Sequence, residues 1–122
     1  MSFHDELAKV CGGADGALIC TLMSFDGIPV DTAIRQGSTE EPEAQAAMTE
    51  IALIARQLKT VMIEGGHGTP SELTVSLPGC LLAVRPLTDE YFMALAVSPG
   101  GNFGKGRYLL RVSAPKVLEE LQ

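Results

Sequence analysis

The segment that most suggests chemistry is the glycine-rich stretch Pro99–Gly106, which contains Lys105. Glycine N–H groups and a lysine side chain can together hold a phosphate. A P-loop, however, requires G-x-x-x-x-G-K-[ST], whereas this chain has proline at position 99 and glycine at position 106, so the hydroxyl for magnesium is missing. We therefore interpret the stretch as a turn, with Asn102 as the cap of a final helix.

The histidines and cysteines have no spacing typical of a metal or catalytic site. The sequence contains no C-x-x-C pair that could bind a metal together with His4 or His67. H-E-x-x-H and G-x-S-x-G motifs are also absent. Cys20 and Cys80 lie in apolar runs, where free cysteine behaves as a small buried hydrophobe. The remaining thiol is Cys11. We expect no metal and no cofactor, and His67, between glycines, should face solvent.

The carboxylate pairs lie at predicted helix ends. Glu40 and Glu41 fall in the first turn of a helix, where the helix dipole favours them, and Glu119 and Glu120 are simply exposed. No intrinsic active site is visible, so we expect a protein without enzymatic activity of its own. A very small hydrolase is an alternative that the sequence leaves open.

Composition narrows the class of protein. The 122 residues fit one domain, 1–122, and the net charge of −6 with 5% aromatic residues disfavours nucleic acids and anionic membrane surfaces. The charged N-terminus lacks the apolar core of a signal peptide, and no run is long enough to span a membrane. We expect a cytoplasmic location.

The periodicity predicts three helices. The first covers residues 3–11, the second residues 40–64 with Ser38 or Thr39 as its cap, and the third begins near Asn102 and is interrupted or kinked at Pro115. The second helix carries an apolar stripe that is broader than a coiled-coil seam. The stripe contains Ala44, Ala47, Met48, Ile51, Ile54, Ala55, Leu58, Val61 and Met62.

Five strands are expected, at 17–25, 28–34, 72–77, 80–87 and 91–98. Asp26-Gly27 is a strong hairpin signal, and Pro29 cannot donate a ladder hydrogen bond, so its strand should lie at an edge. The strands 17–25 and 91–98 are the most apolar and should be central. The prediction is an α/β sandwich in the order α-β-β-α-β-β-β-α, with a five-stranded antiparallel sheet ordered 2-1-5-4-3.

Two motifs in this order resemble the Roadblock/dynein light chain family. Asp26-Gly-Ile-Pro-Val30 is similar to its D-G-[LI]-P-[IV] hairpin, and Asn102-Phe-Gly-Lys-Gly-Arg107 is similar to its N-x-G-x-x-R helix opening. The resemblance covers almost the whole chain and is greatest to compact prokaryotic, MglB-like members. It implies a profilin-like Roadblock fold that acts on other proteins.

The resemblance further implies a homodimer, in which the long helices pack antiparallel and the sheets join at the 72–77 edge. The expected dimer interface contains Ala44, Met48, Ile51, Ala55, Leu58, Met62, Leu73 and Val75. The opposite side of the long helix is small and neutral apart from one leucine, and charged residues are depleted in this way at interface cores. We expect the partner to bind there, at Ala46, Thr49, Leu53, Gln57 and Thr60.

The predicted function is a homodimeric, non-catalytic regulator of a small Ras-like GTPase, with a GTPase-activating effect as one form of regulation. The main alternative is a structural scaffold or light-chain adaptor that leaves nucleotide turnover unchanged. A small-molecule sensor is a third class, but it would need a polar-lined pocket that aliphatic helices on a sheet do not suggest.

Overall fold

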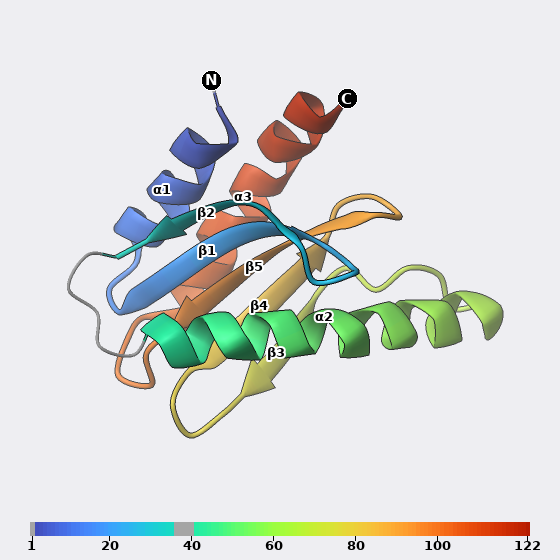
Figure 1. Ribbon diagram of the computed structural model, residues 1–122, viewed down its shortest axis with the longest axis horizontal. Coiled ribbons are helices and arrows are strands. Elements are labelled where there is room, and N and C mark those ends of the chain that lie inside the picture. Colours follow the sequence, from blue (N-terminus) through green and yellow to red (C-terminus); the bar gives the residue numbers. More distant parts are fainter. Residues whose placement is uncertain (1, 36–40) are drawn as a thin grey trace.

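The computed structural model describes residues 2–35 and 41–122, which form three helices and five strands (Figure 1). The element order is the predicted α-β-β-α-β-β-β-α. The elements are α1 (Phe3–Gly13), β1 (Ala17–Ser24), β2 (Pro29–Ile34), α2 (Glu41–Glu64), β3 (Leu73–Ser76), β4 (Leu81–Pro86), β5 (Tyr91–Val97) and α3 (Phe103–Leu121).

All neighbouring strands of the sheet are antiparallel, in the order β2-β1-β5-β4-β3. The predicted order is therefore confirmed, with β5 in the middle and β2 and β3 at the edges. Pro29 lies on the edge strand β2, as its missing N–H requires. The register of β1 and β2 shifts between Leu22 and Met23, next to this proline.

The two faces of the sheet pack against different helices. Figure 1 shows α1 and α3 together on one face and α2 on the other. Alternate residues of β5 divide between the two cores: Met93 and Leu95 face α1 and α3, whereas Phe92 and Ala94 face α2. Burial on both sides explains why β1 and β5 are nearly continuous apolar runs.

Local signals at the helix ends and turns act as the residue types predict. Ser2 and Asp5 form a capping box at the start of α1. Asn102 caps α3, because its Oδ1 accepts a hydrogen bond from the N–H of Lys105 at 3.1 Å. The turn between β1 and β2 places Gly27 at φ +87°, a left-handed conformation that favours glycine.

The glycine-rich stretch before α3 serves close packing of two backbone segments. A Cβ on Gly101 would lie 2.5 Å from the carbonyl oxygen of Asp15 and 2.8 Å from Cα of Gly16. The segments are joined by hydrogen bonds from Asn102 N–H to the Asp15 carbonyl at 2.7 Å and from Ser98 N–H to the Gly16 carbonyl at 2.8 Å. The glycines at 16 and 101 are thus explained by the approach of these segments.

Two local predictions differ from the structure or lie outside it. An interruption at Pro115 is wrong, because α3 is continuous to Leu121. Pro115 is exposed, so water can reach the carbonyl of Arg111 that loses its helical donor. The predicted caps Ser38 and Thr39, with Glu40, lie outside the described residues.

Candidate interaction surfaces

The described His, Cys, Asp and Glu side chains do not gather into a candidate metal site. Within residues 2–35 and 41–122, no group of three His, Cys, Asp or Glu could hold a metal ion. All three cysteines are buried and none forms a disulfide, and burial raises the pKa of the Cys11 and Cys20 thiols, which disfavours the reactive thiolate. His67 is exposed, as predicted. Among the described helices, none is long and apolar enough to cross a bilayer.

The side of α2 that faces the sheet is covered by this chain itself. Ala44, Met48, Ile51 and Ala55 are each 8% exposed or less and pack in the core with β1 and β5. These four residues were assigned to the dimer interface from the sequence, yet they have almost no area left for a second subunit. The assigned residues that keep partial exposure are Leu58, Met62, Leu73 and Val75.

One flank of α2 is apolar and exposed. Ile54 is 53% exposed and Val61 is 57% exposed, whereas Ala47 on the same flank packs partly against the core beside Leu73 and Val75 of β3. Figure 1 shows that the last turns of α2 project beyond the strands, which leaves this end of the helix without a sheet beside it. We call Ala47, Ile54, Leu58, Val61, Leu73 and Val75 the apolar flank.

The apolar flank continues to an unpaired sheet edge. Among the described strands, β3 pairs with β4 alone, and its outer side is the end of the sheet. An exposed edge presents free N–H and C=O groups to a second strand. Hydrophobic side chains and an unpaired strand therefore lie together on one side of the molecule, where a second copy could cover both.

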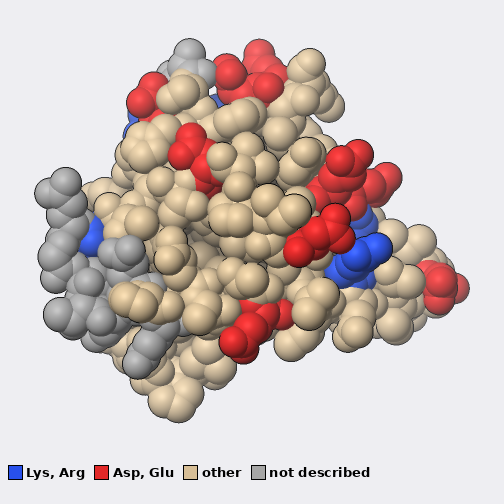
Figure 2. All heavy atoms as spheres, viewed as in Figure 1, with Lys and Arg blue, Asp and Glu red and all other residues tan. Residues whose placement is uncertain are grey.

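The outer side of α2, opposite the side that faces the sheet, contains the residues assigned to partner binding. All five are exposed, with Leu53 at 59%, so none of them packs in the core. We call these residues the neutral strip: Ala46, Thr49, Leu53, Gln57 and Thr60. Figure 2, in the view of Figure 1, shows that most of the face formed by α2 is uncharged, with acidic and basic groups in small patches.

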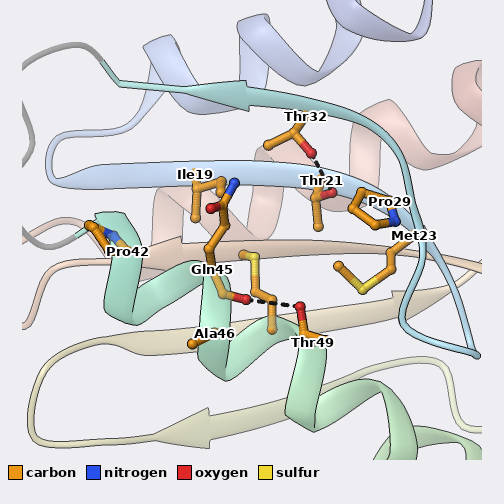
Figure 3. A pocket seen from close by; sticks show the side chains of 10 residues that line it. Ile19, Thr21, Met23, Pro29, Thr32, Pro42, Gln45, Ala46 and Thr49 are labelled. Atoms are coloured by element: carbon orange, nitrogen blue, oxygen red, sulfur yellow. Dashed lines mark hydrogen bonds between the residues drawn. The ribbon is translucent and has the colours of Figure 1, made fainter.

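A groove that sequence reasoning missed lies beside the neutral strip. It has a volume of about 430 Å³ and separates the first half of α2 from β1 and β2, with Ala46 and Thr49 on one wall. Figure 3 shows the hydroxyls of Thr21 and Thr32, 2.9 Å apart, across from Gln45, whose carbonyl accepts from Thr49 Oγ1 at 3.2 Å. The sequence feature that could have indicated the groove is Thr21, a polar residue inside the apolar run 17–25.

Polar contacts hold the β1–β2 hairpin to α2. Arg56 donates to Asp26 of the hairpin at 2.9 Å. Lys59 is 8% exposed, and its Nζ lies 4.8 Å from the centre of the Phe25 ring and 3.3 Å from Asp89 Oδ1. Lys59 therefore belongs to the sheet-facing side of α2. The sequence did not predict this position, because a charged residue is normally expected at the surface.

Known structures with this arrangement are small Roadblock-type α/β domains. MglC from Myxococcus xanthus is 41% identical, with a TM-score of 0.82 over 98% of this chain and 99% of that one. A Roadblock/LC7 domain from Streptomyces avermitilis is 14% identical, with a TM-score of 0.80 over 99% and 98%. The gliding protein MglB from Thermus thermophilus is 15% identical, with a TM-score of 0.76 over 96% and 91%.

The chain belongs to the Roadblock family, and MglC is its relative by sequence as well as by fold. The likeness to MglB, expected from the motifs, is confirmed at the level of the fold. The profilin-like architecture is also confirmed, by a TM-score of 0.56 with profilin II of Acanthamoeba castellanii. No protein-family profile and no curated protein matches the chain.

Proposed function

We propose that this protein is a homodimeric regulator of a small Ras-like GTPase and performs no chemistry of its own. The observation that carries the proposal is the division of α2 between two exposed flanks. One is apolar and borders an unpaired strand, whereas the other is small and neutral. A helix with these two surfaces can join a second subunit and still offer a platform to a partner.

The apolar flank supports the dimer part of the proposal. Ile54 and Val61 are each more than half exposed, although burial of such a side chain stabilises a protein by about 1.5–3 kcal/mol. Pairing of two β3 edges would also satisfy backbone groups that otherwise face water. Antiparallel contact of two α2 helices with joined β3 edges would cover both features in one symmetric interface.

The neutral strip supports the partner part of the proposal. In a dimer formed through the apolar flanks, the two strips would lie on the same outer side of the paired helices. The groove beside Thr49 widens this platform toward β2 and adds the half-buried hydroxyl of Thr32 as a hydrogen-bonding group, while the Thr21 hydroxyl is buried and donates to the Asp31 carbonyl. Leu53 is the one large apolar side chain of the strip and would be its anchor.

A structural scaffold without effect on nucleotide turnover remains the second candidate, because it would use the same fold and the same surfaces. The two functions differ in the rate at which the partner hydrolyses GTP. The test therefore measures single-turnover GTP hydrolysis by the Ras-like GTPase that copurifies with this protein from its native host, with and without the protein.

The key variant is Leu53→Arg. We expect its affinity for the GTPase to fall by about 1 kcal/mol or more, with the dimer and its melting temperature nearly unchanged. A rate change produced by wild type and reduced by Leu53→Arg would support regulation. Binding that leaves the hydrolysis rate unaltered would support the scaffold instead.

A matched control is Val112→Arg, which also places arginine at an exposed apolar position but on α3, on the other face of the sheet. This variant should bind the GTPase as wild type does. If Leu53→Arg and Val112→Arg bind with equal affinity, the platform does not lie on α2. Failure to recover any GTPase with the protein would contradict the proposed function.

A further inference from the structure

A cluster of arginines lies on the α3 side of the sheet, away from α2. Arg85 of β4 and Arg107 and Arg111 of α3 line one shallow depression of about 270 Å³, together with Gly104, Tyr108 and Glu72. The whole chain has only nine Lys and Arg against fifteen Asp and Glu. A third of its positive side chains is therefore gathered in one place on an acidic protein.

One of the arginines already binds a carboxylate in this depression. Arg107 donates from Nε to Glu72 Oε1 and from Nη2 to Glu72 Oε2, both at 2.9 Å. This two-point geometry is the one by which guanidinium groups recognise carboxylates. The hydrogen bond from Arg107 holds the pKa of the Glu72 carboxyl below its usual value, so Glu72 is charged at neutral pH.

The carboxylate of Glu72 does not neutralise the charge of the three arginines. In the part of the chain that the structure describes, no ion pair is found for Arg85 or Arg111. Both are near enough to Glu72 to lower its pKa through their charge, yet neither bonds to it. Two guanidinium groups therefore remain available beside a carboxylate that is already bound.

The composition of the depression is that of an interaction hot spot. The Tyr108 ring is 54% exposed, and the Arg111 guanidinium lies 5.5 Å from its centre. Tyrosine and arginine are enriched among the residues that dominate binding energy. Gly104 adds a stretch of α3 without a side chain, where a Cβ would meet no atom closer than 3.8 Å. An extended peptide could therefore approach the helix backbone here.

We propose that this depression binds an acidic segment of another protein, with Arg85 and Arg111 pairing with its Asp or Glu side chains beside Tyr108. Charge complementarity identifies the occupant, since the depression is a positive site on a negative protein. The two hydrogen bonds from Arg107 to Glu72 show how an arginine of this depression binds a carboxylate. The site is distinct from the α2 platform and does not depend on the proposed GTPase.

Polyanions of other classes fit the molecule less well. The net charge of −6 repels a nucleic acid or an anionic bilayer as it approaches, because both present many charges over a surface larger than this depression. A short acidic peptide requires only a local match. Its binding should weaken as salt increases, because Arg107 and Arg111 are exposed and Arg85 is only half-buried.

The test measures fluorescence anisotropy of a short fluorescein-labelled peptide of alternating glutamate and glycine, titrated with the full-length protein at low and at physiological salt. A peptide with glutamine in place of glutamate is the uncharged comparison. We expect the acidic peptide to bind and the glutamine peptide not to bind. In Arg85→Gln/Arg111→Gln, affinity for the acidic peptide should fall roughly tenfold.

Glu72→Gln provides the opposite readout. This variant removes the internal carboxylate and frees Arg107, so acidic-peptide affinity should rise roughly threefold. Lys105→Gln/Lys116→Gln removes two positive charges and Glu120→Gln removes one negative charge elsewhere on α3, so these variants match the test variants in charge and are the controls. They should stay near wild type, and circular dichroism verifies that each variant is folded.

Four results would overturn the proposal. One is that the acidic peptide fails to bind even Glu72→Gln. Another is that Arg85→Gln/Arg111→Gln behaves like Lys105→Gln/Lys116→Gln, which would mean that only the net charge of the protein matters. The third is that vesicles of phosphatidylcholine and phosphatidylglycerol, but not the peptide, bind through Arg85 and Arg111. A drop in self-association of the arginine variants during sedimentation would equally contradict it, because the occupant would then be a second copy.

Discussion

The two faces of the sheet differ in how completely their helices cover them. On one face, α1 and α3 lie side by side and bury Leu7, Leu95 and Leu110 without residual exposure. On the other face, α2 alone covers the sheet, and Ile54 and Val61 on its flank stay more than half exposed. The core of the first face is closed by two helices, with Tyr108 and Val112 exposed on the outer side of α3, whereas the second face leaves Ile54 and Val61 uncovered beside the sheet edge.

Because of this difference, we expect substitutions on one face to change stability and substitutions on the other to change association. Core substitutions on the α1/α3 face should change the free energy of unfolding, because every neighbour there belongs to the same chain. Substitutions on the flanks of α2 should change binding instead. Adjacent residues on α2 even fall on different surfaces, since Ile54 belongs to the apolar flank and Leu53 to the neutral strip.

The largest expected effect is on the completed face. Leu110→Ala should lower the free energy of unfolding by about 2–5 kcal/mol, because Leu110 is fully buried and the deleted atoms leave a cavity. Urea denaturation at a fixed protein concentration measures the loss. Leu53→Ala, at a position 59% exposed, is the control and should change stability by less than about 0.5 kcal/mol. Equal losses in both variants would contradict the comparison.

The next effect concerns the open face. Ile54→Arg should convert the proposed dimer to a folded monomer, because a charged side chain in the apolar contact would be buried without a partner. Sedimentation velocity at micromolar concentration gives the mass, and circular dichroism verifies the fold. Leu53→Arg, one residue away, should remain a dimer. A wild-type protein that sediments as a monomer would exclude the α2-mediated dimer.

An arginine at Ile51 or Ala55 is a less informative probe of the dimer. Both side chains are buried against this chain's own sheet, at 8% and 6% exposure. Arginine there would place a charge in the core of one subunit and should cause misfolding rather than clean dissociation. Ile54 and Val61 separate the two outcomes because they do not take part in that core.

The smallest effect is at the rim of the completed face, where Glu72 pairs with Arg107. The hydrogen bond from Arg107, with the charges of Arg107, Arg85 and Arg111, lowers the pKa of Glu72 from 4.5 against a raising effect of burial. A carboxyl with a lowered folded-state pKa stabilises the protein above its unfolded pKa, and this contribution disappears as pH falls through the folded value.

Glu72→Gln should therefore be slightly less stable than wild type at neutral pH, and the difference should vanish on acidification below 4.5. Thermal melts from pH 7 downward measure it, and Glu120→Gln controls for loss of an exposed carboxylate. A difference that grows toward low pH would mean that the pair does not stabilise the fold.

Much of the fold could be predicted from short patterns. The Asp26-Gly27 turn, the edge position of Pro29 and the cap at Asn102 each follow from a local property of the backbone, and all three agree with the structure. Interface residues were harder to predict. Part of the apolar stripe of α2 packs on the sheet and part stays exposed, and periodicity alone does not mark where the core ends and the surface begins.

The sequence by itself determined the element types, their order and the strand arrangement, because hydrophobic period, turn residues and caps act over a few neighbouring positions. Only the tertiary structure decided which apolar residues of α2 pack in the core, and that the charged residue Lys59 is buried beside them. It alone showed why Gly16 and Gly101 must meet, and that Glu72, Arg85 and Arg107 gather from distant segments. Such contacts depend on how far each element extends over its neighbours, a three-dimensional property that no local pattern records.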